Sequence, residues 1–133
     1  MEIYSGVKFE IENIGEQFDT DDRLPSLNRW AYVFAELGLA PVHSAGAFGN
    51  HSYRDSGESF IITRTGMIPC GQLDKEDFCR ASYDIGGRRF VVQGRHQPSS
   101  ESFLHHSIYQ NYPEVNAVMH GHSALLNEYA GAL

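Results

Sequence analysis

Two histidines near the end of the chain, His120 and His122, have the spacing of metal ligands. In a β-strand, side chains two residues apart point to the same face, with backbones about 7 Å apart. Two imidazole rings on one strand face can therefore bind one cation. Because isolated pairs of this kind are more often hydrogen-bonded or exposed, a metal site here requires a third ligand.

The carboxylate of Glu101 is the candidate for that third ligand. It follows Pro98-Ser99-Ser100, in which Ser99 or Ser100 can cap a helix whose dipole favours a carboxylate in the first turn. At such a helix end, Glu101 could bind the cation or act as general acid and base. The serine hydroxyls and unpaired N–H groups of the same turn suit a phosphate dianion. Taken alone, the segment is an ordinary helix-capping sequence.

Two further turns could contribute to an anion site. Gly49-Asn50 follows a glycine-rich stretch, and Thr65-Gly66 follows a compact apolar run. A glycine lets backbone N–H groups approach an anion without a Cβ in the way. Each of these turns, considered separately, is more typical of a plain connection.

The hydrophobic pattern predicts the elements that would position these residues. Alternation or compact apolar runs predict strands over residues 7–11, 60–62, 78–83, 89–93 and 115–122. Apolar spacing and capping residues predict helices over residues 27–37, 99–109 and 123–130, with a short acidic helix beginning at Asp74. Gly86-Gly87 predicts a hairpin between two of the strands. The polar, glycine-rich residues 41–57 are expected to form a loop.

Composition limits the class of protein. A chain of 133 residues with 41% apolar and 20% charged residues can form one folded domain. A net charge of −7, with ten scattered basic residues, argues against nucleic-acid binding. The apolar stretches fall far short of the roughly 20 residues that span a membrane. Cys70 and Cys79 lack CxxC spacing and Met1-Glu2 opens no signal-like segment, which favours reduced thiols in the cytoplasm.

Four separated motifs together resemble the class II aldolase/adducin family. In order along the chain they are Gly49-Asn50-His51-Ser52-Tyr53-Arg54, Ile61-Ile62-Thr63-Arg64-Thr65-Gly66, Gly94 with Pro98-Ser99-Ser100-Glu101, and, after His105, Tyr109 and Pro113, Ala117-Val118-Met119-His120-Gly121-His122-Ser123. The resemblance covers roughly residues 26–130 of a single domain, 1–133, in which residues 1–25 form an N-terminal extension. It implies a three-layer α/β/α fold with a central, mainly antiparallel sheet.

The resemblance also implies roles for individual residues. The substrate phosphate would be held by Gly49, Asn50, Thr65, Gly66, Ser99 and Ser100. Zinc would be bound by His120 and His122, with Glu101 as a resting-state ligand and the catalytic acid/base. The same donors also suit Mn²⁺, Co²⁺ or Fe²⁺. The remaining histidines are interpreted as structural or exposed: His43, His51, His96, His105 and His106.

The implied reaction is the metal-dependent, aldolase-like cleavage of a small sugar phosphate. Zinc would stabilise the enediolate formed by retro-aldol cleavage, with dihydroxyacetone phosphate as a simple substrate fragment. The family's third zinc histidine has no counterpart after His122, so the sequence matches a C-terminally shortened member that is expected to form a homo-oligomer.

Three interpretations remain open at this point. In the first, a lyase uses water, Glu101 or a residue of a neighbouring subunit as the missing ligand. In the second, the protein is a pentulose-phosphate 4-epimerase, although the glutamate at position 101 argues against an enzyme type that carries aspartate there. In the third, it is a non-catalytic, adducin-like binding or assembly protein.

Overall fold

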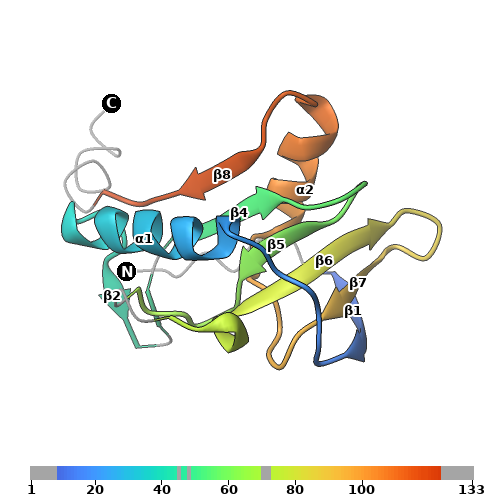
Figure 1. Ribbon diagram of the computed structural model, residues 1–133, viewed down its shortest axis with the longest axis horizontal. Coiled ribbons are helices and arrows are strands. Elements are labelled where there is room, and N and C mark those ends of the chain that lie inside the picture. Colours follow the sequence, from blue (N-terminus) through green and yellow to red (C-terminus); the bar gives the residue numbers. More distant parts are fainter. Residues whose placement is uncertain (1–8, 45, 48, 70–72, 124–133) are drawn as a thin grey trace.

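A six-stranded sheet forms the centre of the computed structural model, which describes residues 9–44, 46–47, 49–69 and 73–123 (Figure 1). From one edge to the other the strands are β1 (Glu10–Gly15), β7 (Arg89–Gln93), β6 (Phe78–Asp84), β5 (Phe60–Thr63), β4 (Asn50–Arg54) and β8 (Ala117–His120). The pair β1–β7 is parallel and the other neighbouring pairs are antiparallel. The sheet is therefore mainly antiparallel, which confirms the predicted fold class.

Two helices, α1 (Arg23–Glu36) and α2 (Ser102–Asn111), cover opposite faces of this sheet (Figure 1). Ile61 of β5 packs in a cluster with Leu27 of α1. Its neighbours Phe60 and Ile62 instead pack in a cluster with Tyr109 of α2. Because side chains alternate along a strand, the two clusters lie on opposite faces. The result is the expected three-layer α/β/α arrangement.

Residues 41–57 do not form the predicted loop. They contain the short antiparallel pair β2 (Val42–His43) and β3 (Gly46–Ala47), followed by β4 inside the main sheet. The first four side chains of β4 are buried, although three of them are polar. The sequence pattern does not predict strand β4, because its residues do not alternate between apolar and polar. They do not alternate because both faces of the strand are covered.

The remaining predictions differ from the structure mainly at boundaries. Hairpin β6–β7 and strand β5 are confirmed, and the acidic helix at Asp74 is a 3₁₀ turn, η1 (Lys75–Asp77), closed by a capping box. Strand β1 begins later than expected, and residues 7–8 lie outside the described residues, as do Cys70 and most of the predicted helix 123–130. Within the described residues, no helix is long and apolar enough to cross a membrane.

One buried histidine gives the fold a predictable sensitivity to acid. His51 is fully buried on the α1 face of β4, in ring contact with Phe34, and its two ring nitrogens have no hydrogen-bond partner among the described residues. Burial, with a smaller contribution from His120, lowers the pKa of His51 to about 4. Burial also lowers the pKa of His105 to about 3.

We expect the free energy of unfolding to fall by about 2–4 kcal/mol between pH 7 and pH 5. Below the ordinary histidine pKa of 6.5, the unfolded chain binds protons that the folded chain excludes until near pH 4. Urea denaturation at both pH values measures the change. His51→Leu should show a smaller loss on acidification than the wild type, and an identical loss would contradict this origin.

Candidate metal and phosphate site

The two candidate metal ligands lie at the end of β8 and in the residues that follow it. The imidazole rings of His120 and His122 have centroids 4.9 Å apart. The backbone N–H of His122 donates to the Leu39 carbonyl at 2.7 Å, which fixes this segment beside the end of α1. A Cβ on the intervening Gly121 would lie 2.9 Å from the Phe34 ring. Glycine thus allows the backbone to pass α1 closely while both histidines keep their positions.

Both imidazoles are held in the neutral form that binds metals. Burial lowers the pKa of His120 and of His122. The Nδ1 atom of His120 is buried and has no hydrogen-bond partner among the described residues. An unpaired, neutral imidazole nitrogen is a suitable ligand atom for zinc and similar cations. The histidine pair therefore fits a metal.

Glu101 lies close enough to His122 for each to affect the other's charge. Burial raises the pKa of Glu101, and the nearby His122 partly offsets that rise. Yet no group of three His, Cys, Asp or Glu side chains within the described ranges has an arrangement that could hold a metal ion. The role of Glu101 as the third ligand consequently remains a prediction.

Two of the three turns proposed for phosphate binding, Thr65-Gly66 and Ser99-Ser100, come together near the start of α2. Thr65 N–H donates to the Gln97 carbonyl at 2.9 Å, and Ser99 N–H donates to the Thr63 carbonyl at 3.0 Å. This pairing brings the Thr65-Gly66 turn beside Ser99. A Cβ on Gly46 would lie 2.7 Å from the Gly66 backbone, so the chain leading into β4 packs directly on the same turn. The third turn lies elsewhere along α2 and β8, because a Cβ on Gly49 would lie 2.8 Å from the His120 carbonyl and the Asn50 side chain contacts His105.

The start of α2 differs from the prediction by two to three residues. The helix begins at Ser102, and Glu101 occupies the N-cap position without a capping hydrogen bond from its side chain. Ser99 Oγ accepts the Glu101 N–H at 3.1 Å, which leaves the carboxylate itself uncommitted to the helix end. Ser99 is buried, whereas Ser100 is exposed. A ligand from solvent would meet Ser100 before Ser99.

A buried polar network behind the site was not anticipated from the sequence. Ser52 Oγ lies 2.6 Å from His105 Nδ1 and 2.7 Å from the Tyr109 hydroxyl, and His105 Nε2 lies 2.5 Å from Asn50 Oδ1. The network joins a candidate phosphate ligand on β4 to α2. The sequence indicated this network only through residue spacing. Asn50 and Ser52 share a strand face, and His105 and Tyr109 share a helix face.

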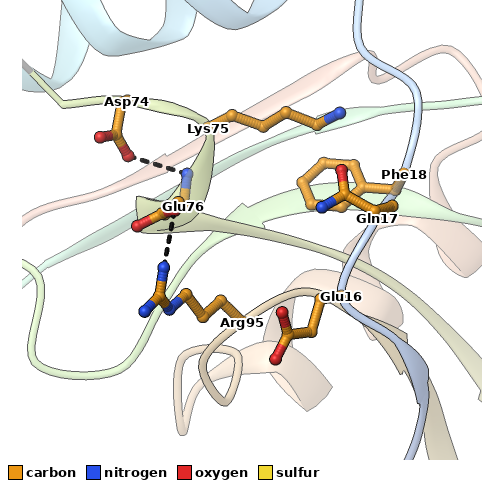
Figure 2. Close-up of a pocket in the computed structure, with 7 residues that line it drawn as sticks. All are labelled: Glu16, Gln17, Phe18, Asp74, Lys75, Glu76 and Arg95. Carbon is orange, nitrogen blue, oxygen red and sulfur yellow. Dashed lines mark hydrogen bonds and ion pairs between the residues drawn. The ribbon is translucent and has the colours of Figure 1, made fainter.

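A separate pocket of about 400 Å³ lies between the residues after β1, η1 and Arg95 (Figure 2). Figure 2 shows the Arg95 guanidinium paired with the Glu76 carboxylate, at 2.9 Å. The ammonium group of Lys75 lies over the Phe18 ring, 4.9 Å from its centroid. The residues lining this pocket include none of the candidate site residues, so we assign it no part in the chemistry.

Comparison with known proteins identifies the family. Residues 28–130 match the sequence profile of the Class II Aldolase and Adducin N-terminal domain. The chain belongs to this family. The match spans the three turns and both histidines described above.

The names of several proteins that are similar to this chain refer to enzymes of phosphorylated sugars. The chain is 45% identical over 78 residues to an L-fuculose phosphate aldolase of Methanococcus maripaludis, covering 59% of this chain and 39% of that protein. It is 40% identical over 88 residues to a methylthioribulose-1-phosphate dehydratase of Marinobacter nauticus, covering 66% and 38%. A solved L-fuculose 1-phosphate aldolase superposes with a TM-score of 0.61 at 25% identity, covering 84% of this chain and 49% of that one. The chain thus spans about two fifths of the length of these curated relatives.

Proposed function

We propose that this protein is a metal-dependent, aldolase-like lyase that cleaves a small sugar phosphate by a retro-aldol reaction. The observation that carries the proposal is the register of β4 and β8, in which Asn50 lies directly opposite His120. Directly opposed side chains of an antiparallel pair have Cβ atoms about 5 Å apart on the same face. A candidate phosphate ligand and a candidate metal ligand therefore adjoin, and a short phosphorylated substrate could contact both.

In this proposal the side chains divide into a metal set and a phosphate set. His120, His122 and Glu101 would hold Zn²⁺, or Mn²⁺, Co²⁺ or Fe²⁺ in its place. A bound cation supplies Lewis-acid stabilisation of negative charge that develops on the substrate oxygens. Glu101 would accept and return the proton at the reacting carbon, as general base and then general acid.

The phosphate set would hold the phosphate end of the substrate and thereby orient its reacting end. Its members are Gly49, Asn50, Thr65, Gly66, Ser99 and Ser100. The N–H groups of Thr65 and Ser99 donate to backbone carbonyls, so these two residues would meet the anion through their hydroxyl groups. Short polar side chains and N–H groups in turns suit a phosphate group in a protein with a net charge of −7, because they bind the anion locally without a basic surface. Holding the phosphate end fixes the reacting carbon against the acid/base group. The names of the curated relatives, which refer to phosphorylated sugars, support this substrate class.

Exchange of a carbon-bound proton of dihydroxyacetone phosphate with deuterated solvent tests the proposal. We expect the zinc-loaded protein to catalyse the exchange and a chelator to stop it. Dihydroxyacetone without phosphate should exchange at least about tenfold more slowly, because it lacks the anchored end. Proton NMR follows both reactions.

A matched pair of serine variants tests the phosphate contribution in the same assay. Ser100→Ala should raise KM for dihydroxyacetone phosphate and leave exchange of dihydroxyacetone unchanged. Ser107→Ala, on α2, should alter neither. No exchange by metal-loaded wild-type protein would refute the lyase and leave the adducin-like binding protein, whereas interconversion of pentulose phosphates without net cleavage would identify a 4-epimerase.

A further inference from the structure

Four side chains form a chain of hydrogen bonds in the layer between β4 and α2. Tyr109 and His105 of α2 contact Ser52 of β4 at 2.7 and 2.6 Å, and His105 also contacts Asn50 at 2.5 Å. All four residues are at most 5% exposed. Because buried polar groups need partners, the directions of these hydrogen bonds are constrained by the donors and acceptors available.

The helix that carries His105 and Tyr109 is held firmly to the strand. Arg54, the last residue of β4, donates from Nη2 to the Tyr109 carbonyl at 3.1 Å and from Nε to the Val115 carbonyl at 2.9 Å. Its guanidinium also lies over the Tyr109 ring, 4.7 Å from the centroid. Hydrogen bonds from an ionised donor are stronger than neutral ones. The geometry of the four-residue chain is therefore set by the backbone as well as by the side chains.

Only one arrangement of hydrogens satisfies this chain with the Asn50 amide placed as in the structure. The Asn50 carbonyl oxygen only accepts, so His105 must donate to it from Nε2. A neutral imidazole then has an unprotonated Nδ1, which accepts from the Ser52 hydroxyl, and Ser52 accepts from the Tyr109 hydroxyl. Burial, which lowers the pKa of His105 to about 3, keeps the ring neutral.

The opposite arrangement is less favourable and would present the wrong group to an anion. If the Asn50 amide were reversed, His105 would donate to Ser52 and Ser52 to Tyr109. The Tyr109 O–H would then lack the acceptor that Ser52 provides, and a buried unpaired donor costs about 1–3 kcal/mol. The free end of the Asn50 amide would be its carbonyl oxygen, which repels a phosphate oxygen.

We infer that His105 is a positioning residue, which, together with Ser52 and Tyr109, holds the Asn50 carboxamide with its NH₂ group directed at the substrate phosphate. This inference rests on the proposed function, in which Asn50 binds phosphate. Among the described residues, the hydrogen bond that fixes the Asn50 carboxamide is the one between its carbonyl oxygen and His105. With the oxygen held by His105, the NH₂ group is the end of the amide that would face a ligand.

The tautomer of His105 gives a direct test that needs no substrate. In ¹⁵N-labelled wild-type protein, NMR should show His105 with its proton on Nε2 and an unprotonated Nδ1. Ser52→Ala removes the donor to Nδ1 and should make the Nδ1–H form detectable. A wild-type ring protonated on Nδ1 would overturn the inference.

Binding of inorganic phosphate, followed by ³¹P NMR titration, provides the functional test. His105→Phe should raise the Kd by about tenfold, because the Asn50 carbonyl oxygen, left without its donor, favours the reversed orientation that presents it to the phosphate. His105→Gln, whose amide N–H can replace Nε2–H, should restore affinity to within about threefold of the wild type. His106→Phe is the matched control, since His106 lies on the same helix but packs against Tyr83 and Phe103, and it should bind as the wild type does.

The outcomes separate this inference from the proposed function. If the wild type binds phosphate and folded His105→Phe binds it equally well, the inference fails and the proposed function stands. If the wild type binds no phosphate, both fail. Should His105→Phe not fold, Ser52→Ala takes its place in the titration, and affinity equal to that of the wild type would again overturn the inference.

Discussion

Replacing Glu101 with glutamine should slow proton exchange of dihydroxyacetone phosphate by about 10²–10⁴-fold while zinc remains bound. Glutamine keeps the size of the side chain and an oxygen, but it cannot accept and return a proton at the reacting carbon. Glu101 stands at the N-cap position of α2 without a capping hydrogen bond from its side chain, so the change leaves the helix end intact. Proton NMR in deuterated solvent measures the exchange, and elemental analysis measures the zinc.

An exposed glutamate supplies the control for this experiment. Glu114 lies between α2 and β8 and is exposed, so Glu114→Gln makes the same chemical change away from the site. It should leave both exchange and zinc content unchanged. Exchange by Glu101→Gln at the wild-type rate would show that Glu101 takes no part in the mechanism. Loss of zinc together with loss of exchange would show that Glu101 acts mainly as a metal ligand.

The parts of the fold that sequence patterns predicted are those with one dominant environment. Strand β5 is a continuous apolar run, and Gly86-Gly87 lie in the turn that joins β6 to β7. Both elements were therefore predictable from local signals. Helix α1 was also predictable from its apolar spacing, although Trp30 and Leu37, which contribute to that spacing, are exposed. These elements form most of the sheet and one of its covering layers.

Strand β4 could not be predicted because its polar side chains are satisfied by distant residues. Ser52 is a loop-forming residue by local preference, yet its partners His105 and Tyr109 lie more than fifty positions away in the chain. Local patterns contain no information on such partners. The same network explains why His105, interpreted as structural or exposed, is fully buried beside a candidate ligand.

The site was predictable only as a set of motifs. The spacing of His120 and His122 indicated convergence, and their rings do lie close together. The approach of Gly66 to Gly46, and of Ser99 to Thr63, depends on the tertiary fold. The family resemblance assigned Thr65, Gly66 and Ser99 to one site but gave Gly46 no role. Neither the sequence patterns nor the family resemblance could predict the side-chain geometry around Glu101. That geometry depends on how far a partly buried carboxylate moves toward a cation.

Removing both histidines should abolish zinc binding. We expect wild-type protein to retain about one zinc per chain after dialysis against metal-free buffer, and His120→Ala combined with His122→Ala to retain almost none. A single carboxylate cannot hold zinc against dialysis once both imidazoles are gone. The matched control, His96→Ala with His106→Phe, removes two histidines elsewhere and should keep its zinc. Full zinc content in the His120/His122 variant would place the metal at other residues.

The dependence of zinc content on protein concentration identifies the source of the third ligand. Two imidazoles are one ligand fewer than the three protein ligands of a typical catalytic zinc site, and the described residues offer no third side chain already in place. A ligand donated by a second copy in a homo-oligomer is lost on dilution, so zinc content should fall together with the oligomer. Zinc content independent of dilution assigns the position to Glu101 or water, and the Glu101→Gln variant then distinguishes these two.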